Sequence, residues 1–126
     1  MRVFVSTLAA AALASIVLWG PSPASAQDTS NLTWQFHSTY PGTIYLEFYS
    51  RQYNRKWPAG EVYVVHPNQG GTASLRCLYG EYICYGAWLA SNSSTYWGVG
   101  RGGQQGCQQC CARCGHGDVT QITLSP

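Results

Sequence analysis

Four of the six cysteines of this chain lie within eight positions near its C-terminus. They form two C-x-x-C units placed back to back, Cys107-x-x-Cys110 and Cys111-x-x-Cys114, with glycines on both sides. Four clustered thiolates can hold a structural zinc ion in tetrahedral geometry. In an oxidising compartment the same residues form disulfides instead. The chemistry of the cluster therefore depends on where the protein folds.

The N-terminus has the pattern of a secretory signal peptide. A positive charge at Arg2 precedes an uncharged apolar run from Val3 to Trp19, and Ala24-Ser25-Ala26 supplies a small-x-small cleavage box. A membrane anchor is the alternative, but the run is short for a span, and prolines follow it. We therefore predict a signal peptide over residues 1–26 and a mature chain over residues 27–126.

Export favours disulfides over zinc. The cysteine count is even, and a domain of this size gains roughly 2–4 kcal/mol from each bridge. A thioredoxin-like redox motif would require a βαβ unit, which the sequence lacks. We predict no cofactor, and we keep zinc at the four clustered cysteines as the alternative, with His116 as a possible substitute ligand. The cysteines expected to form disulfides are Cys77, Cys84, Cys107, Cys110, Cys111 and Cys114.

Composition argues against several classes of partner. The net charge is +2 and would fall by one with the loss of Arg2, and charged residues are 10% of the chain, clustered only at Arg55-Lys56. Nucleic-acid binding and polybasic membrane anchoring both require a larger basic footprint. No second apolar run is long enough to span a membrane. An envelope component or a glycan is the expected partner, and the sequence does not indicate an oligomeric state.

The mature chain is predicted to be one all-β domain, with a Cys-rich loop at residues 106–117. Apolar and polar residues alternate with period two, and turn residues separate the segments. We expect a small antiparallel sandwich or barrel of about seven strands, stapled by disulfides. Loops are expected at 52–60 and 91–94. The predicted strands cover residues 32–37, 43–49, 62–66, 72–78, 82–88, 95–99 and 119–124.

One disulfide is predicted from a hairpin. Gly80-Glu81 resembles the two-residue loop of a type II′ turn, which would place Cys77 directly opposite Cys84. Opposed residues have Cα atoms about 4.5–5.5 Å apart, within reach of a disulfide. The sequence therefore favours Cys77–Cys84. In the alternative, each of the two cysteines pairs with a member of the later cluster.

Pairing inside the cluster stays open. A vicinal Cys110–Cys111 bridge would be strained and is disfavoured. Cys107 with Cys111 and Cys110 with Cys114 form one possible arrangement, and either C-x-x-C unit closed on itself is another.

No catalytic motif is present, so we predict no catalytic residue and regard an enzyme as the less favoured class. The sequence lacks G-x-S-x-G, H-E-x-x-H and phosphate-binding loops. A small hydrolase could be assembled from His37, Glu47 and a serine, and it is the alternative function. His37 alternates with Trp34 and Phe36, however, which is typical of a solvated strand position.

The aromatic residues suggest a binding surface. Trp34 and Trp88 fit a β core, whereas Trp57 follows two basic residues in a loop and Tyr96-Trp97 begins a strand. Exposed aromatics on a rigid β scaffold often form a contact face. We predict that Trp57, Tyr96 and Trp97 lie exposed on one face of a non-catalytic binding or structural module.

Three segments together resemble a group of proteins. "ICYGAW" at residues 83–88, "YWGVG" at 96–100 and "GCQQCCARCG" at 106–115 are similar to small exported cysteine-rich bacterial proteins of uncharacterised function. The likeness covers roughly the second half of the mature chain. It implies a periplasmic or secreted bacterial product and supplies no activity. In a eukaryotic source, Asn31 and Asn92 would be glycosylation acceptors.

Overall fold

The computed structural model describes residues 19–20, 28–115 and 119–126, so the predicted signal peptide, apart from Trp19 and Gly20, lies outside the described residues. The described part contains strands and one short 3₁₀ turn, η1 (Arg101–Gly103), and no α-helix. No helix in these ranges is long and apolar enough to cross a membrane. The all-β prediction is confirmed. The strands are β1 (Thr29–Ser38), β2 (Ile44–Ser50), β3 (Lys56–Trp57), β4 (Tyr63–Val65), β5 (Gly70–Leu78), β6 (Tyr82–Leu89), β7 (Asn92–Gly98), β8 (Cys111–Arg113) and β9 (Thr120–Leu124).

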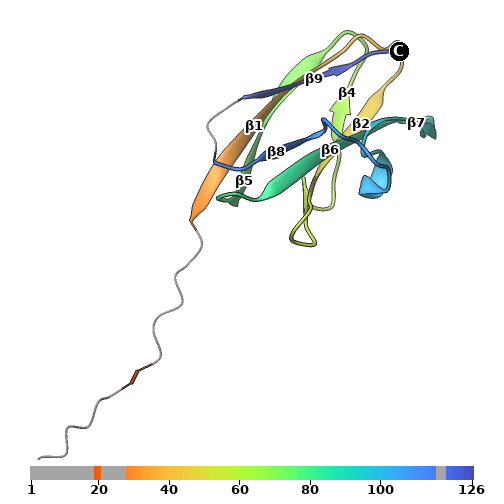
Figure 1. Cartoon of the computed structure of the whole chain (residues 1–126). Helices are drawn as coiled ribbons and strands as arrows, with labels where there is room; N and C mark the ends of the chain where they lie inside the picture. Colours follow the sequence, from red (N-terminus) through yellow and green to blue (C-terminus); the bar gives the residue numbers. More distant parts are fainter. Residues whose placement is uncertain (1–18, 21–27, 116–118) are drawn as a thin grey trace, which may run out of the picture.

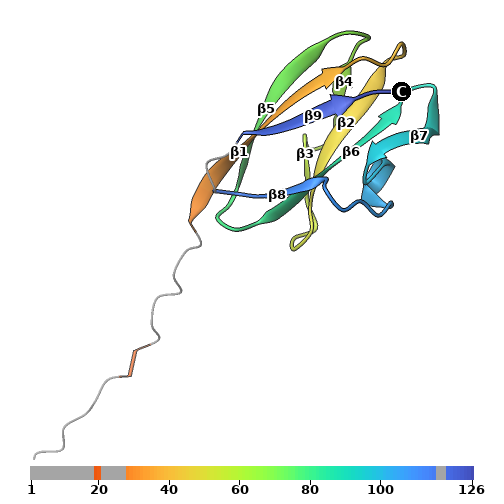
Figure 2. The ribbon, with the colours of Figure 1, turned by 45° about the horizontal axis from the view of Figure 1, so that its top comes forward.

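The strands form two facing sheets, a small β-sandwich (Figures 1 and 2). Sheet A has the order β5-β1-β9, in which β1 and β9 are parallel. Sheet B has β2 and β6 at its centre; β3 and β4 pair with β2, while β7 and β8 pair with β6. All pairings in sheet B are antiparallel.

Period-two alternation gives sheet B an inner face and an outer face. Along β2, Ile44, Leu46 and Phe48 point into the space between the sheets, and the residues between them point outward. The inner side chains of both sheets make one apolar core, which supplies most of the hydrophobic stabilisation. Its buried members are Leu32, Trp34, Ile44, Leu46, Phe48, Val65, Ala73, Leu75, Cys77, Ile83, Ala87, Cys114, Ile122 and Leu124.

The predicted Cys77–Cys84 disulfide is wrong because β5 and β6 do not form a hairpin. The turn between them carries the chain from sheet A to sheet B. Its central residues are Tyr79 and Gly80, with Gly80 at φ 81° and the Glu81 amide donating to the Leu78 carbonyl at 2.9 Å. A positive φ at the third position of a turn favours glycine. Cys77 consequently faces the core, whereas Cys84 faces outward from sheet B.

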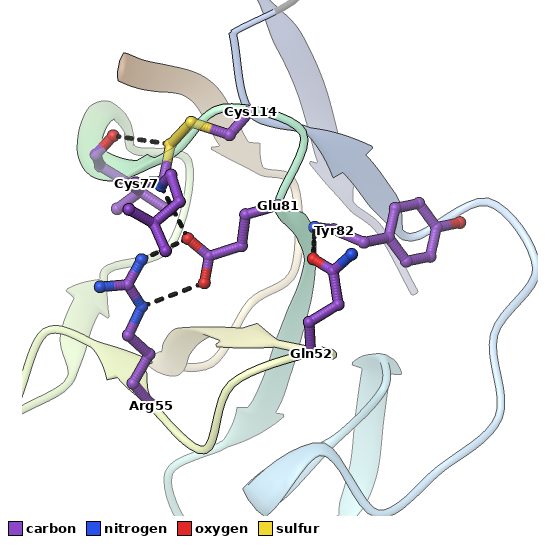
Figure 3. The surroundings of a disulfide bond; sticks show 8 residues. Gln52, Arg55, Cys77, Glu81, Tyr82 and Cys114 are labelled. Atoms are coloured by element: carbon purple, nitrogen blue, oxygen red, sulfur yellow. Dashed lines mark hydrogen bonds and ion pairs between the residues drawn. A yellow bond between two sulfur atoms is a disulfide. The ribbon is translucent and has the colours of Figure 1, made fainter. Parts of the chain in front are cut away.

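Glu81, expected in a loop, is instead buried beneath this turn. Its carboxylate accepts a hydrogen bond from the Leu78 amide at 2.9 Å and forms an ion pair with Arg55 (Figure 3). Arg55 also lies over the ring of Trp57, 4.9 Å from its centroid. The corner between the sheets is therefore held by charge as well as by apolar contacts.

Two short strands were expected to be loops. β3 lies inside the predicted 52–60 loop and pairs with the end of β2. β8 lies inside the predicted Cys-rich loop and pairs with the start of β6. Strands of two or three residues carry too few side chains to show a period-two pattern.

Candidate ligand-binding site

Disulfides staple one end of sheet B. Cys84 on β6 and Cys111 on β8 are register partners on the outer face, with Cα atoms 3.9 Å apart. Cys77–Cys114 joins sheet A to the residue after β8. The first C-x-x-C unit closes on itself as Cys107–Cys110. All six cysteines are thus paired, and three disulfides suggest an oxidising, exported environment.

The alternative prediction, a structural zinc site, requires four free thiolates close enough to bind one ion. In the structure, Cys107 and Cys110 bond to each other, whereas Cys111 and Cys114 bond to partners on two different strands. Within the described ranges, no cluster of three or more potential metal ligands is found. His116 lies outside the described residues.

A loop crosses the outer face of sheet B next to the staples. We call residues 99–110 the lid; it includes η1. Val99 and Cys110 of the lid pack with Tyr49 and Cys84 of the sheet in a second apolar cluster. A Cβ atom at Gly86 would collide with the Gly100 carbonyl oxygen, so the lid can approach β6 only over a glycine.

Beneath the lid lies a small polar network. The Tyr49 hydroxyl donates to Glu47, and it accepts from the Gly102 amide at 2.9 Å. Lys56 donates to the same Glu47 carboxylate at 2.8 Å. Burial and the neighbouring carboxylate raise the pKa of Tyr49 well above its ordinary value, and the hydrogen bond from the Gly102 amide and the positive charge of Arg101 oppose them more weakly. Tyr49 is therefore a neutral anchor that fixes the lid on the sheet.

Beyond the lid, the outer face carries a row of apolar side chains across four strands. Val64, Tyr45, Trp88 and Tyr96 are successive register partners on β4, β2, β6 and β7, and we call them the aromatic row. The Tyr45 and Trp88 rings meet edge to face, with centroids 6.1 Å apart. Val64 is 50% exposed and Tyr96 is 45% exposed, whereas Trp88 is only 6% exposed. Trp88 therefore forms a floor, and its neighbours are the accessible surface.

A shallow depression of about 560 Å³ opens above this floor. Arg101 of the lid borders it, with the guanidinium carbon 5.9 Å from the centroid of the Trp88 ring. Ser91 of the β6–β7 turn and the first two residues of β7, Asn92 and Ser93, supply hydroxyl and amide groups on another side. Within the part of the chain that the structure describes, no acidic side chain lines the depression. Its lining residues are Tyr45, Val62, Trp88, Ala90, Ser91, Asn92, Ser93 and Arg101.

The three predicted contact residues do not share one exposed face. Tyr96 points outward, next to Trp88. Trp97 points inward and is partly buried against the core, and its indole N–H donates to the Ser125 carbonyl at 2.8 Å. Trp57 also packs on the core, at the opposite edge of sheet B. Adjacent strand residues face opposite sides, which separates Tyr96 from Trp97.

The residues of the hydrolase alternative lie on different sheets. His37 is exposed on β1 of sheet A, beside a depression that it lines with Gln121 and Thr123. Glu47 is buried on the outer face of sheet B, where Tyr49 and Lys56 occupy its carboxylate. The structure therefore does not bring this acid and this histidine together.

Sequence reasoning missed Tyr45, Trp88 and Arg101 as site residues. Trp88 was expected in the core; it is buried, but outside the central cluster that contains Ile83 and Ala87 of the same strand. Their shared parity places Trp88 on the other face, a pattern that the sequence does contain. No local pattern indicates that Arg101 reaches this floor, because the approach depends on how the lid folds.

No protein-family model, curated protein or solved structure matches this chain. The resemblance to small exported cysteine-rich bacterial proteins stays a prediction.

Proposed function

We propose that this protein is an exported, non-catalytic binding module of the bacterial periplasm or extracellular medium, and that it binds saccharides at the depression on the outer face of sheet B. The predicted signal peptide and the three disulfides support export. The observation that carries the binding proposal is the aromatic row beside a rim of hydroxyl and amide groups.

The chemistry of this surface suits a sugar. The faces of aromatic rings are electronegative, so they attract the weakly positive C–H groups of a pyranose. Ser91, Asn92 and Ser93 offer donors and acceptors for its hydroxyl groups. A hollow of several hundred Å³ that combines aromatic rings with a few polar groups is compatible with a small-molecule site.

The scaffold holds this surface rigid. Tyr45, Trp88 and Tyr96 lie on three hydrogen-bonded strands, and the Cys84–Cys111 disulfide fixes the other end of β6. Side chains that are already ordered lose little entropy when a ligand binds. A non-catalytic binding role requires only such a preorganised surface, without a nucleophile or a general base.

The proposal is tested by titrating the disulfide-bonded protein with a panel of envelope and plant-type oligosaccharides. We expect Tyr45→Ala to weaken binding about tenfold, since aromatic anchors contribute on the order of 1–2 kcal/mol. Tyr96→Ala should weaken it less, because Tyr96 lies beside Trp88 but does not line the depression. Calorimetry or a glycan array gives the affinities, and thermal unfolding checks that both variants remain folded.

Tyr79→Ala is the matched control. Tyr79 is 62% exposed at the turn before β6, at the other end of that strand from Trp88. Affinity should not change in this variant. Absence of binding to every saccharide, or binding that survives both test substitutions, would contradict the proposal.

A further inference from the structure

We infer that the saccharide bound at this depression is acidic, and that Arg101 pairs with its carboxylate. The inference rests on the proposed function and adds the chemical class of the sugar. It follows from the charge of the depression, from the position of Arg101 and from the geometry of a guanidinium group.

No acidic side chain in residues 28–115 and 119–126 forms an ion pair with Arg101. The ion pairs within the described ranges are Arg55–Glu81 and Lys56–Glu47, and Arg101 takes part in neither. Among the described residues, no aspartate or glutamate lines the depression. Glu47, on the same face, is already bonded to Lys56 and Tyr49. A ligand with a negative group would therefore supply the missing counter-charge.

The backbone on both sides of Arg101 is fixed. The Gly100 amide donates to the Trp97 carbonyl at 3.1 Å, and the Gly102 amide donates to the Tyr49 hydroxyl at 2.9 Å. One hydrogen bond thus ties the lid to β7 and the other ties it to β2. Because the backbone is held, the Arg101 side chain extends from a defined point at the border of the depression.

The guanidinium group selects among anions. Its planar N–H groups match the two oxygens of a carboxylate in a bidentate pair. In the same depression, the aromatic floor and the serine and asparagine rim suit the ring and hydroxyl groups of a sugar. A uronic acid combines these features in one residue.

The test compares a galacturonic acid trisaccharide with the neutral galactose trisaccharide, titrated into the disulfide-bonded protein at low and physiological salt. We expect the acidic sugar to bind at least tenfold more tightly at low salt, and this preference to shrink as salt is added. Arg101→Gln should abolish the preference while binding of the neutral sugar remains. Arg101→Lys should retain part of it, because the charge is kept but the bidentate geometry is lost.

Arg113→Gln is the matched control, because Arg113 is an exposed arginine on β8 whose guanidinium lies over Tyr82. Equal binding of both sugars, or a preference that persists in Arg101→Gln, would overturn the inference and leave the proposed function standing. A sulfated galactose trisaccharide that binds more tightly than the uronate would overturn the carboxylate assignment. If neither trisaccharide binds, both the inference and the proposed function fail for this class of sugar.

Discussion

The two ends of β6 present the same outer face of sheet B in opposite states. At the Cys84 end, a disulfide, β8 and the lid cover the sheet. At the Trp88 end, β6 contributes Trp88 to the aromatic row, which is covered only in part. One end of this face is therefore covered by contacts that stabilise the fold, and the other end is partly accessible to solvent. We therefore expect substitutions at the covered end to lower the stability of the fold. We expect substitutions at the open end to weaken the proposed saccharide binding instead.

Two arginines repeat this contrast. Arg55, at the covered end, forms an ion pair with the buried Glu81 and stacks on Trp57. Arg101, at the open end, lies over the Trp88 ring, takes part in neither of the two ion pairs of the described residues, and borders the depression. A charge with a protein partner serves the fold. A charge that borders an accessible depression is available to bind a ligand.

The largest effect is expected from the disulfide that joins the two sheets. Replacing Cys77 and Cys114 by alanine removes a link across a sequence separation of 37. Loop-closure entropy predicts a loss of about 4 kcal/mol in the free energy of unfolding. Urea denaturation of the oxidised double variant measures this loss.

The Cys107–Cys110 pair is the matched control for this experiment. Its sequence separation is 3, so the same replacement should cost about 2 kcal/mol or less. Equal losses in the two double variants would refute the view that the inter-sheet link dominates the covered end.

A smaller effect that depends on pH is expected at Glu81. Burial alone would raise its pKa, but hydrogen bonds from Arg55, Ser50 and the Leu78 amide outweigh burial and hold the pKa below its ordinary value of 4.5. A carboxyl group with a lowered folded-state pKa stabilises the fold above its unfolded pKa. That contribution is lost as the pH falls through the folded-state pKa.

Glu81→Gln should therefore lower the free energy of unfolding by about 1–3 kcal/mol at neutral pH. Below about pH 4.5, the free energy of unfolding should also fall less steeply in the variant than in the native protein. Glu61→Gln, at an exposed position, is the control. If Glu81→Gln leaves the pH profile unchanged, the ion pair does not stabilise the corner between the sheets.

The strand pattern could be predicted from the sequence, but the connections between strands could not. Alternation in Leu32, Trp34 and Phe36 located β1, and similar patterns located the other long strands. The pairing of Cys77 and Cys84 depended on whether β5 and β6 share a sheet. A Gly-containing turn is compatible with a hairpin and with a crossover between sheets, so local sequence does not distinguish them.

The candidate site, like the strand connections, could be predicted from the sequence only in part. Tyr96 was predicted from its place at the start of a strand, and it does lie on the outer face. Trp57 and Trp97 were predicted by residue type, and burial against the core placed them elsewhere. The depression combines β2, β6, the β6–β7 turn and the lid, which are separate in sequence. Their meeting is set by packing, which no short motif encodes.

The smallest expected effect lies at the boundary between the two ends, at Tyr49. Tyr49→Phe keeps the ring that packs on Val99 and Cys110 but removes the hydroxyl shared by Glu47 and the Gly102 amide. The loss in the free energy of unfolding should be about 1 kcal/mol, because Lys56 still neutralises Glu47. The Gly102 amide would lose its partner on the sheet, so the neighbouring Arg101 should be held less firmly. Titration should then show weaker binding of the galacturonic acid trisaccharide with little change for the neutral one. Equal weakening for both sugars would mean that Tyr49 supports the whole depression and not the arginine alone.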